Sequence, residues 1–181
     1  TPRQIDKLRR GELDLGFVWL PVPSDEFDIQ ELVKEPFIAV LPSNHRLASA
    51  SAISIKDLSQ EPMVTFPRDQ GIASFQRIEQ LFLIAGAEMN VAYELEVLHS
   101  LINFVAMGCG CSIVPDYVRR LHVDGIVYRP IIPPTIVETL AVIKTKGCGG
   151  LTDAFYQFVA ESLADYDSEH FPHFTTEILR R

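Results

Sequence analysis

The segment from Leu98 to Asp116 (LHSLINFVAMGCGCSIVPD) constrains the fold more than any other part of this sequence. Its apolar residues at helical spacing are Leu98, Leu101, Ile102 and Val105. Gly108 and Gly110 follow, where the exit from a helix needs residues that tolerate positive φ. A short apolar strand from Cys111 to Val114 comes next, and Pro115 ends it. A short apolar strand with helices on both sides predicts a parallel strand in an α/β sheet.

Ligands of α/β sheets bind beyond the carboxyl ends of the strands and near helix N-termini, so the region just before Leu98 is a candidate site. A second candidate follows the predicted strand Met63–Phe66, where a polar loop leads into a helix expected over Ala73–Ala85. The unpaired N–H groups of that helix favour anions. Arg68 can add a bidentate partner for a carboxylate. The alternative is that Arg68 pairs with a local acid such as Asp69.

Composition and charge exclude several classes of function. The chain has 181 residues, 47% of them hydrophobic and 22% charged, which is ordinary for one globular domain or two small lobes. The net charge of −8 argues against nucleic-acid binding by this segment alone, because phosphate contacts need clustered Lys and Arg. No apolar run approaches the roughly 20 residues of a membrane helix, and the first residues lack the apolar core of a signal peptide.

No pattern of catalytic, metal-binding or cofactor-binding residues is present. The sequence has no G-x-S-x-G elbow, no P-loop and no H-E-x-x-H helix. The glycines around Cys109 follow a helix and precede a strand, the reverse of a dinucleotide-binding turn. Three cysteines, of which Cys109 and Cys111 are too close to pair easily, indicate buried thiols in a reducing cytosol. We therefore expect a binding protein without cofactor or metal.

The order of predicted elements indicates a two-lobed, hinged protein. Two long apolar strands, Phe37–Leu41 and Val137–Lys144, bracket a middle segment of roughly 100 residues, which is the size of a domain. A separate edge strand is expected over Phe27–Leu32. The last helix is expected to begin at a Thr152 cap and to bury a stripe consisting of Phe155, Phe158, Val159 and Leu163.

Several single residues carry weaker signals. Trp19 lies at the carboxyl end of a predicted strand, which favours a cleft position as much as the alternative of a core aromatic. His45 lies in a polar loop and is expected to be solvated. His99, in the first turn of the helix that begins at Leu98, has the alternative of a structural or solvent-facing role. His170 and His173 in the tail can share a metal, although such a pair without further ligands is usually solvated.

Four stretches together resemble the effector-binding domain of LysR-type transcriptional regulators. They are LRRGELDLGFVWLPV, EPFIAVLPSNHRLA, SIKDLSQEPMVTFPR and LINFVAMGCGCSIVPDYVRRL, and they occur in unbroken order over about Thr1 to Tyr166. The motifs VAxGxGxxxVP and EPxxxVLPxxHxLA are specific in combination. Within the family, the sequence is most similar to the regulators of aromatic-acid and small organic-anion catabolism.

The resemblance implies an α/β fold like that of the type 2 periplasmic binding proteins, with two Rossmann-like lobes joined by two crossover strands. Residues 1–39 with 141–166 would form lobe I, residues 40–140 lobe II, and residues 167–181 a C-terminal tail. The first strand and helix of lobe I are expected to precede Thr1 and are missing from this sequence. An effector would occupy the cleft between the lobes.

The resemblance also implies which residues contact the effector. In lobe I these are Thr1, Val18 and Trp19, with Trp19 standing where relatives often carry a polar or basic residue. In lobe II the expected contacts are Thr65, Phe66, Pro67, Arg68, Ile72, Ala73 and His99. A helix-start threonine at the position of Thr1 has its hydroxyl in the cleft.

The function expected from the resemblance is sensing of a small organic effector, anionic and possibly aromatic, in the cytoplasm. Contact with DNA would occur only through a winged helix-turn-helix domain absent from this chain. The resemblance also implies a homodimer or tetramer, with no membrane contact. A solute-binding protein of a transporter is the alternative on the same fold. An enzyme has no catalytic constellation to support it.

Overall fold

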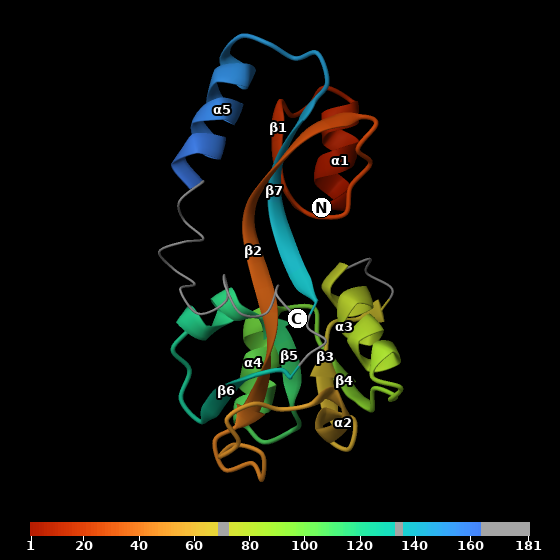
Figure 1. Ribbon diagram of the computed structural model, residues 1–181, viewed down its shortest axis with the longest axis vertical. Helices are drawn as coiled ribbons and strands as arrows, with labels where there is room; N and C mark the ends of the chain where they lie inside the picture. The colour runs from red at the N-terminus through yellow and green to blue at the C-terminus, as the bar shows by residue number, and fades with distance from the viewer. Residues whose placement is uncertain (69–72, 133–135, 164–181) are drawn as a thin grey trace. The chain divides into compact units, whose positions relative to one another are not determined.

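The computed structural model describes residues 1–68, 73–132 and 136–163, apart from the side chains of Ala73 and Ser74. The chain divides into two compact units (Figure 1). Among the described residues, unit 1 consists of Thr1–Lys34 and residues 139–163, and unit 2 lies within Glu35–Glu138. Ile72, predicted as an effector contact, and the tail histidines His170 and His173 lie outside the described residues.

Unit 1 is a sheet with a helix on each face (Figure 1). Its elements are α1 (Pro2–Arg9), β1 (Leu15–Trp19), the first part of β2 (Phe27–Pro42), the last part of β7 (Val137–Thr145) and α5 (Leu151–Leu163). Strand β7 lies between β1 and β2, and it pairs with β1 in antiparallel register from Leu15 opposite Lys144 to Trp19 opposite Leu140. Successive residues of β7 therefore face α1 and α5 in turn.

That alternation divides the apolar residues of unit 1 into two clusters. On the α1 side the buried residues are Ile5, Leu8, Val18, Phe27, Ala141 and Ile143. On the α5 side they are Leu32, Val33, Val142, Tyr156 and Val159. Both faces of the sheet are covered, which is why β7 is apolar along most of its length.

Unit 2 is a second α/β/α arrangement. Its elements, besides the rest of β2 and the start of β7, are α2 (Ile55–Leu58), β3 (Met63–Thr65), α3 (Ala73–Ile84), β4 (Val91–Glu94), α4 (Leu98–Ala106), β5 (Ser112–Pro115), the 3-10 helix η2 (Asp116–Arg120) and β6 (Ile126–Pro130). Strand β2 pairs antiparallel with β5 and β6, and β3 pairs parallel with β4. A parallel bridge from Met63 to Cys111 joins β3 to the start of β5.

Two clusters cover the faces of the unit 2 strands. Helices α2 and α3 cover one face, over Phe37, Ala39, Leu41, Met63, Cys111 and Ile113. Helix α4 and η2 cover the other, over Ile38, Val40, Val64 and Val114. Residues 37–41 of β2 are thus fully buried on both sides, as their continuous apolar character predicted.

The structure corrects several expectations about the strands. The predicted edge strand Phe27–Leu32 and the buried strand Phe37–Leu41 are one continuous strand, because Glu35–Pro36 interrupts neither the extended backbone nor the burial. Strand β5 forms its regular ladder with β2, which is antiparallel, and its parallel contact is limited to the bridge with β3. The alternation of apolar and polar residues over Val91–Val97 predicts a half-buried strand, yet all four residues of β4 are exposed.

Two further expectations about side chains are wrong in part or in full. The last helix begins at Leu151, so Thr152 lies inside it. Of its expected stripe, Val159 is buried and Leu163 packs on the α5-side cluster, whereas Phe155 and Phe158 stack on each other on the exposed side and Tyr156 is buried instead. His45 is not solvated: its Nε2 lies 3.2 Å from Glu61 Oε2, and its Nδ1 accepts a hydrogen bond from the Leu47 N–H. The S-x-x-D pattern of Ser54 and Asp57 predicts a capping box, and the structure has one at the start of α2.

No helix among residues 1–68, 73–132 and 136–163 is long and apolar enough to cross a membrane.

Gly110 provides a test of the packing between α4 and β5. Its φ is 154°, and a Cβ there would lie 2.3 Å from the Pro62 carbonyl oxygen, which already accepts the Cys111 N–H. We expect Gly110→Ala to lower the free energy of unfolding by roughly 2–4 kcal/mol, because backbone would have to move. Gly108 is the matched control: its φ is 82°, but a Cβ added there would have no atom within 4 Å. Gly108→Ala should cost only about 1 kcal/mol. Equal losses in urea titrations would contradict this account.

Candidate functional site

The carboxyl end of β3 carries a buried hydroxyl group with nothing to bind. Thr65 is the last residue of β3, and its carbonyl oxygen accepts the Leu95 N–H at 2.8 Å. Its side chain is buried, with the residue only 2% exposed, and its Oγ1 has no hydrogen-bond partner among the described residues. A buried polar group without a partner costs free energy, so native proteins keep few of them. Thr65 is therefore the predicted contact with the strongest structural signal.

Phe66 and Pro67, which follow Thr65, are half-buried, and Phe66 packs against the α4 side of the unit 2 core. Arg68 is exposed. Its guanidinium forms an ion pair with Glu79 of α3 and lies 5.7 Å from the centre of the Phe75 ring. Arg68 thus pairs with an acid, as the alternative expected, but this acid is Glu79 on α3 rather than a local one; Asp69 lies outside the described residues. An exposed pair of this kind contributes little to stability.

The start of α4 is the other predicted position in unit 2. Val97 occupies the N-cap without a side-chain hydrogen bond, and the first turn contains no acidic residue. The first N–H groups of α4 therefore present partial positive charge that no residue of this turn neutralises. His99 is exposed in the first turn. Ala73 begins α3, and its side chain is among those not described.

In unit 1, the predicted residues Thr1 and Trp19 meet through a hydrogen bond. The Trp19 N–H donates to Thr1 Oγ1 at 3.1 Å, which leaves the Thr1 hydroxyl proton to donate elsewhere. Trp19 is half-buried at the end of β1. Val18 is fully buried in the α1-side cluster, with neither its side chain nor its backbone exposed.

Gln4 holds the edge of β1 next to Trp19, a role that the sequence did not indicate. Its Oε1 accepts the Phe17 N–H at 3.1 Å, and its Nε2 donates to the Phe17 carbonyl at 2.9 Å. Thr1 followed three residues later by Gln4 is a pattern typical of a capping box, but Thr1 makes no side-chain cap hydrogen bond. Both side chains bind the outer edge of β1 instead, as a neighbouring strand would. Gln4 is half-buried on the face of α1 that meets β1. Its position on that face was the only feature that could have indicated its contact with β1.

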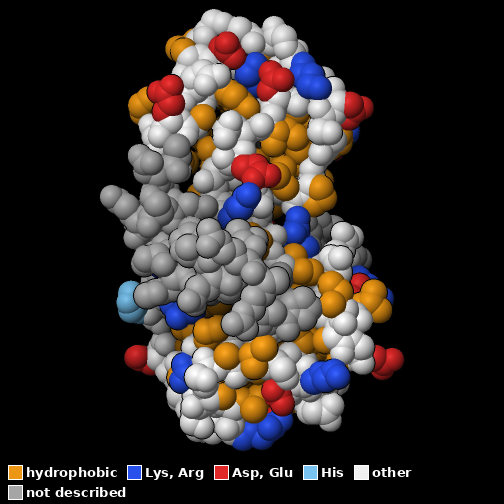
Figure 2. All heavy atoms as spheres, viewed as in Figure 1, with side chains coloured by type: hydrophobic (Ala, Val, Ile, Leu, Met, Phe, Trp, Pro, Cys, Tyr) orange, Lys and Arg blue, Asp and Glu red, His pale blue; other side chains and the backbone are white. Residues whose placement is uncertain are grey.

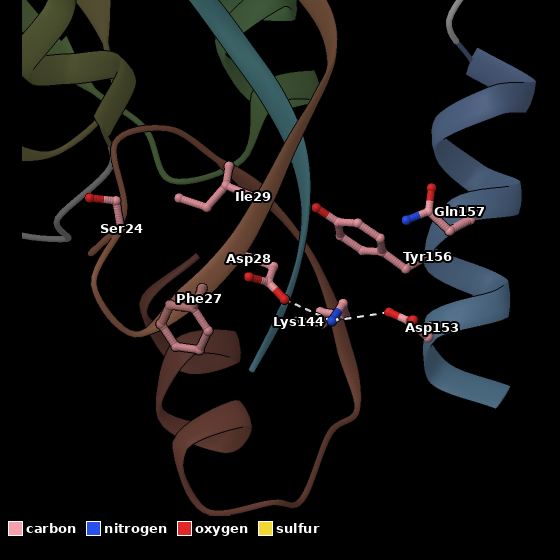
Figure 3. Close-up of a pocket in the computed structure, with 8 residues that line it drawn as sticks. All are labelled: Ser24, Phe27, Asp28, Ile29, Lys144, Asp153, Tyr156 and Gln157. Carbon is pink, nitrogen blue, oxygen red and sulfur yellow. Dashed lines mark hydrogen bonds and ion pairs between the residues drawn. The ribbon is translucent and has the colours of Figure 1, made fainter. Parts of the chain in front are cut away.

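A pocket of about 480 Å³ in unit 1 was missed at the sequence level (Figure 3). At its centre lies Lys144 of β7, whose side chain is only 7% exposed. Its Nζ donates to Asp28 Oδ2 at 2.7 Å and to the Cys148 carbonyl at 3.3 Å, and it lies 3.1 Å from Asp153 Oδ1. The hydrogen bond to Asp28 is the main reason why the pKa of Lys144 is raised. These partners are far apart in the sequence, and no local pattern predicts them.

A Cys–His–Glu arrangement in unit 2 does not supply a nucleophile. Cys111 Sγ lies 3.7 Å from His45 Nε2, which contacts Glu61. Cys111 is fully buried, and burial, followed by the nearby Glu61 charge, raises the pKa of its thiol to about 12. The reactive thiolate is therefore not populated near neutral pH. Among the residues that the structure describes, no group of three His, Cys, Asp or Glu side chains can hold a metal ion.

The surface charge agrees with the acidic composition. On the face shown in Figure 2, the described Lys and Arg side chains lie scattered among Asp and Glu side chains rather than in one continuous basic patch. That distribution does not offer the phosphate backbone of a nucleic acid a continuous contact surface on this face.

The Gln4 contact can be tested with Trp19, which is the sole tryptophan of the chain. We expect Gln4→Leu to remove both hydrogen bonds to Phe17, to lower the free energy of unfolding by about 1 kcal/mol and to shift the fluorescence emission of Trp19. Gln30→Leu is the control, because Gln30 is exposed in the same unit and, within the part of the chain that the structure describes, its amide binds only the neighbouring Glu31 carbonyl. Unchanged Trp19 emission in Gln4→Leu would contradict the positioning role.

Comparison with known proteins agrees with this α/β architecture. The model of the LysR substrate binding domain family matches residues 1–164. The Hca operon transcriptional activator HcaR of Escherichia coli K12 is 29% identical over 160 residues, which cover 88% of this chain and 53% of HcaR. The transcriptional regulator CatR of Pseudomonas putida is 27% identical over 147 residues, 81% of this chain and 50% of CatR. The chain thus spans about half the length of these curated relatives.

Solved structures share the fold. The BenM effector binding domain with its effector benzoate superimposes with a TM-score of 0.81 at 18% identity, covering 92% of this chain and 76% of that one. The reduced form of OxyR gives a TM-score of 0.76 at 23% identity, covering 94% and 79%. These likenesses confirm the predicted fold, that of the periplasmic-binding-protein-like effector domains. With the match over residues 1–164, they show that the chain belongs to the LysR substrate-binding domain family.

Proposed function

We propose that this chain is the effector-sensing part of a LysR-type transcriptional regulator and that it binds a small organic anion. The observation that carries the proposal is the buried, unpartnered hydroxyl of Thr65 at the carboxyl end of β3. A ligand that accepts a hydrogen bond from this hydroxyl would remove the cost of leaving it unpaired. The family membership and the regulator relatives support the sensing role.

An anion is the class of effector that suits the surroundings. The first turn of α4 carries no acidic residue and lacks a side-chain cap, so its N–H groups favour negative charge. The likeness to the BenM domain, whose solved structure holds its effector benzoate, supports a carboxylate. Phe66, Pro67 and His99 remain predicted contacts in unit 2, and Thr1, Val18 and Trp19 in unit 1.

The regulatory proposal extends beyond this chain. DNA contact would be made by a winged helix-turn-helix domain in the half of the relatives that this chain does not span. The effector would bind one arrangement of the sensing domain more tightly than the others and so raise the fraction of the protein in that arrangement. The fraction of regulator molecules bound productively to DNA would change as a consequence. The proposal assigns no catalysis to the chain and places it in the cytoplasm, in keeping with its three free cysteines.

Thr65 allows the binding role to be separated from a structural role. Thr65→Val removes a buried hydroxyl that has no partner, so the free energy of unfolding of the free protein should stay the same or rise by up to about 1 kcal/mol. Binding of the effector, measured by isothermal titration with a panel of aromatic and aliphatic carboxylates, should weaken at least about tenfold.

Ser112→Ala is the matched control for Thr65→Val. Ser112 is also fully buried, and its Oγ likewise lacks a partner among the described residues, but it begins β5 rather than ending a strand. It should change stability in the same direction and leave affinity unchanged. If Thr65→Val binds the carboxylates as well as the wild type does, the proposed site is wrong. Unchanged affinity in Arg68→Ala would exclude Arg68 as an anion clamp and leave the Thr65 contact standing.

We also propose that the chain associates with a second copy of itself through the edge of unit 2. Strand β4 pairs only with β3 among the described strands, and its four residues are exposed without a Pro or Lys to block further pairing. Beside it, Leu83 of α3 is 76% exposed and lines a groove of about 420 Å³ together with Val91 and Phe82. An open edge next to a groove lined in part by exposed apolar side chains suits association between identical chains.

Leu83→Asp tests this surface, since the charge would be buried at the interface of the two copies and the side chain is too exposed to affect folding. We expect self-association, measured by analytical ultracentrifugation, to weaken at least about tenfold. The control is Leu151→Asp on α5, where the leucine is 87% exposed and belongs to unit 1. Equal effects of the two variants, or none from Leu83→Asp, would contradict the assignment.

A further inference from the structure

The proposed anion site and the proposed self-association surface share strand β4. Thr65, whose hydroxyl has no partner among the described residues, lies opposite Glu94, the last residue of β4. The Thr65 carbonyl oxygen accepts the Leu95 N–H at 2.8 Å. Helix α4 begins at Leu98, so only residues 95–97 join it to the end of β4. The position of β4 therefore bears on the backbone at Thr65 and on the start of α4.

Side-chain contacts also connect β4 with both surfaces. Arg68, a predicted anion contact, and Glu94 line the groove of about 420 Å³ together with Leu83. The ring of Tyr93 in β4 packs edge-on against Phe104 of α4, with 5.6 Å between the ring centres. A shift of β4 would thus change the groove and the packing of α4 at the same time.

Strand β4 is weakly held in a single chain. All four of its residues are exposed, and within the described part of unit 2 it pairs with β3 alone (Figure 1). Segments with few buried contacts and exposed backbone open locally at a low cost in free energy. An anion that needs the Thr65 backbone and the first turn of α4 in place would therefore use part of its binding free energy to order β4.

We propose that self-association through β4 and binding of the anion at Thr65 strengthen each other. A second copy that pairs with β4 would order the strand, so the anion would meet a site that is already in place and bind it more tightly. By linkage, the anion would strengthen the association in return. This inference rests on the function and the self-association surface proposed above, and it adds the regulation of each by the other.

The competing explanation is that association only covers the open edge of β4. In that case the outward-facing N–H groups of β4 would become protected in the dimer, and nothing else would change. The Leu95 N–H would exchange with solvent at the same rate as in the monomer, because its acceptor, the Thr65 carbonyl, belongs to the same chain. Affinity for an anion would not depend on protein concentration.

The experiment measures binding of phenylacetate and butyrate, an aromatic and an aliphatic carboxylate, to the full chain by equilibrium dialysis. Affinity should rise at least about fivefold between protein concentrations at which ultracentrifugation shows monomers and those at which it shows dimers. Saturating carboxylate should raise the association constant by the square of that factor, because each dimer holds two sites. Without carboxylate, hydrogen exchange of the Leu95 amide should be slower in the dimer than in the monomer.

Two substitutions of Leu83 separate this coupling from a direct effect of charge on the anion. Leu83→Asp and Leu83→Lys both place a charge in the interface, so both should keep the chain monomeric and hold its affinity at the monomer value at every protein concentration. An affinity that falls in Leu83→Asp and rises in Leu83→Lys would show a charge effect and contradict the coupling. Leu151→Asp, exposed in unit 1, should keep the concentration dependence of the wild type.

The outcomes distinguish this inference from those it rests on. If the carboxylates bind and Thr65→Val weakens them, but affinity is the same in monomer and dimer, the coupling is wrong and the anion site stands. If they bind and the wild type stays monomeric throughout, the self-association surface and the coupling are wrong. If neither carboxylate binds at millimolar concentrations, the anion site and the coupling fall together.

Discussion

Strand β2 is the constraint on which both units depend. Its side chains enter all four apolar clusters: Phe27 packs beside α1, Leu32 and Val33 beside α5, residues 37, 39 and 41 beside α2 and α3, and residues 38 and 40 beside α4. The part of β2 that is buried on both faces, Phe37–Leu41, is apolar throughout. The whole strand must keep its register, because a shift of one residue would exchange the two faces. The helices of each unit can cover the sheet only while this alternation holds.

The fold was predictable wherever periodicity and local chemistry agreed. The Ser54–Asp57 capping box and the helix at Leu98 are set by near neighbours, and the structure contains both. The failures lie where distant contacts decide. Phe27–Leu32 and Phe37–Leu41 were expected to be separate strands, yet β2 runs through both. On α5, helical spacing did not reveal which of its apolar residues face the sheet, and the structure buries Tyr156 while exposing Phe158.

The candidate site, too, has residues that the sequence could indicate and contacts that only the folded chain shows. The rule that ligands bind at the carboxyl ends of strands selected Thr65 and Trp19 from the sequence, but no sequence pattern indicates that the Thr65 hydroxyl lacks a partner. The partner of Arg68 was expected nearby and proved to be Glu79 on α3. The Lys144 cluster joins residues 116 positions apart, and only the folded chain brings them together.

The outer edges of β1 and β4 differ in a way that bears on aggregation. Gln4 and Thr1 occupy N–H and carbonyl groups of β1 at Phe17 and Trp19, so another strand could add there only by displacing side chains that are already bonded. Side chains that blunt an edge protect a sheet from open-ended growth. If β4 alone can accept a neighbour, two chains that pair through it leave no further edge of the same kind, and assembly stops at a closed pair instead of continuing as a fibre.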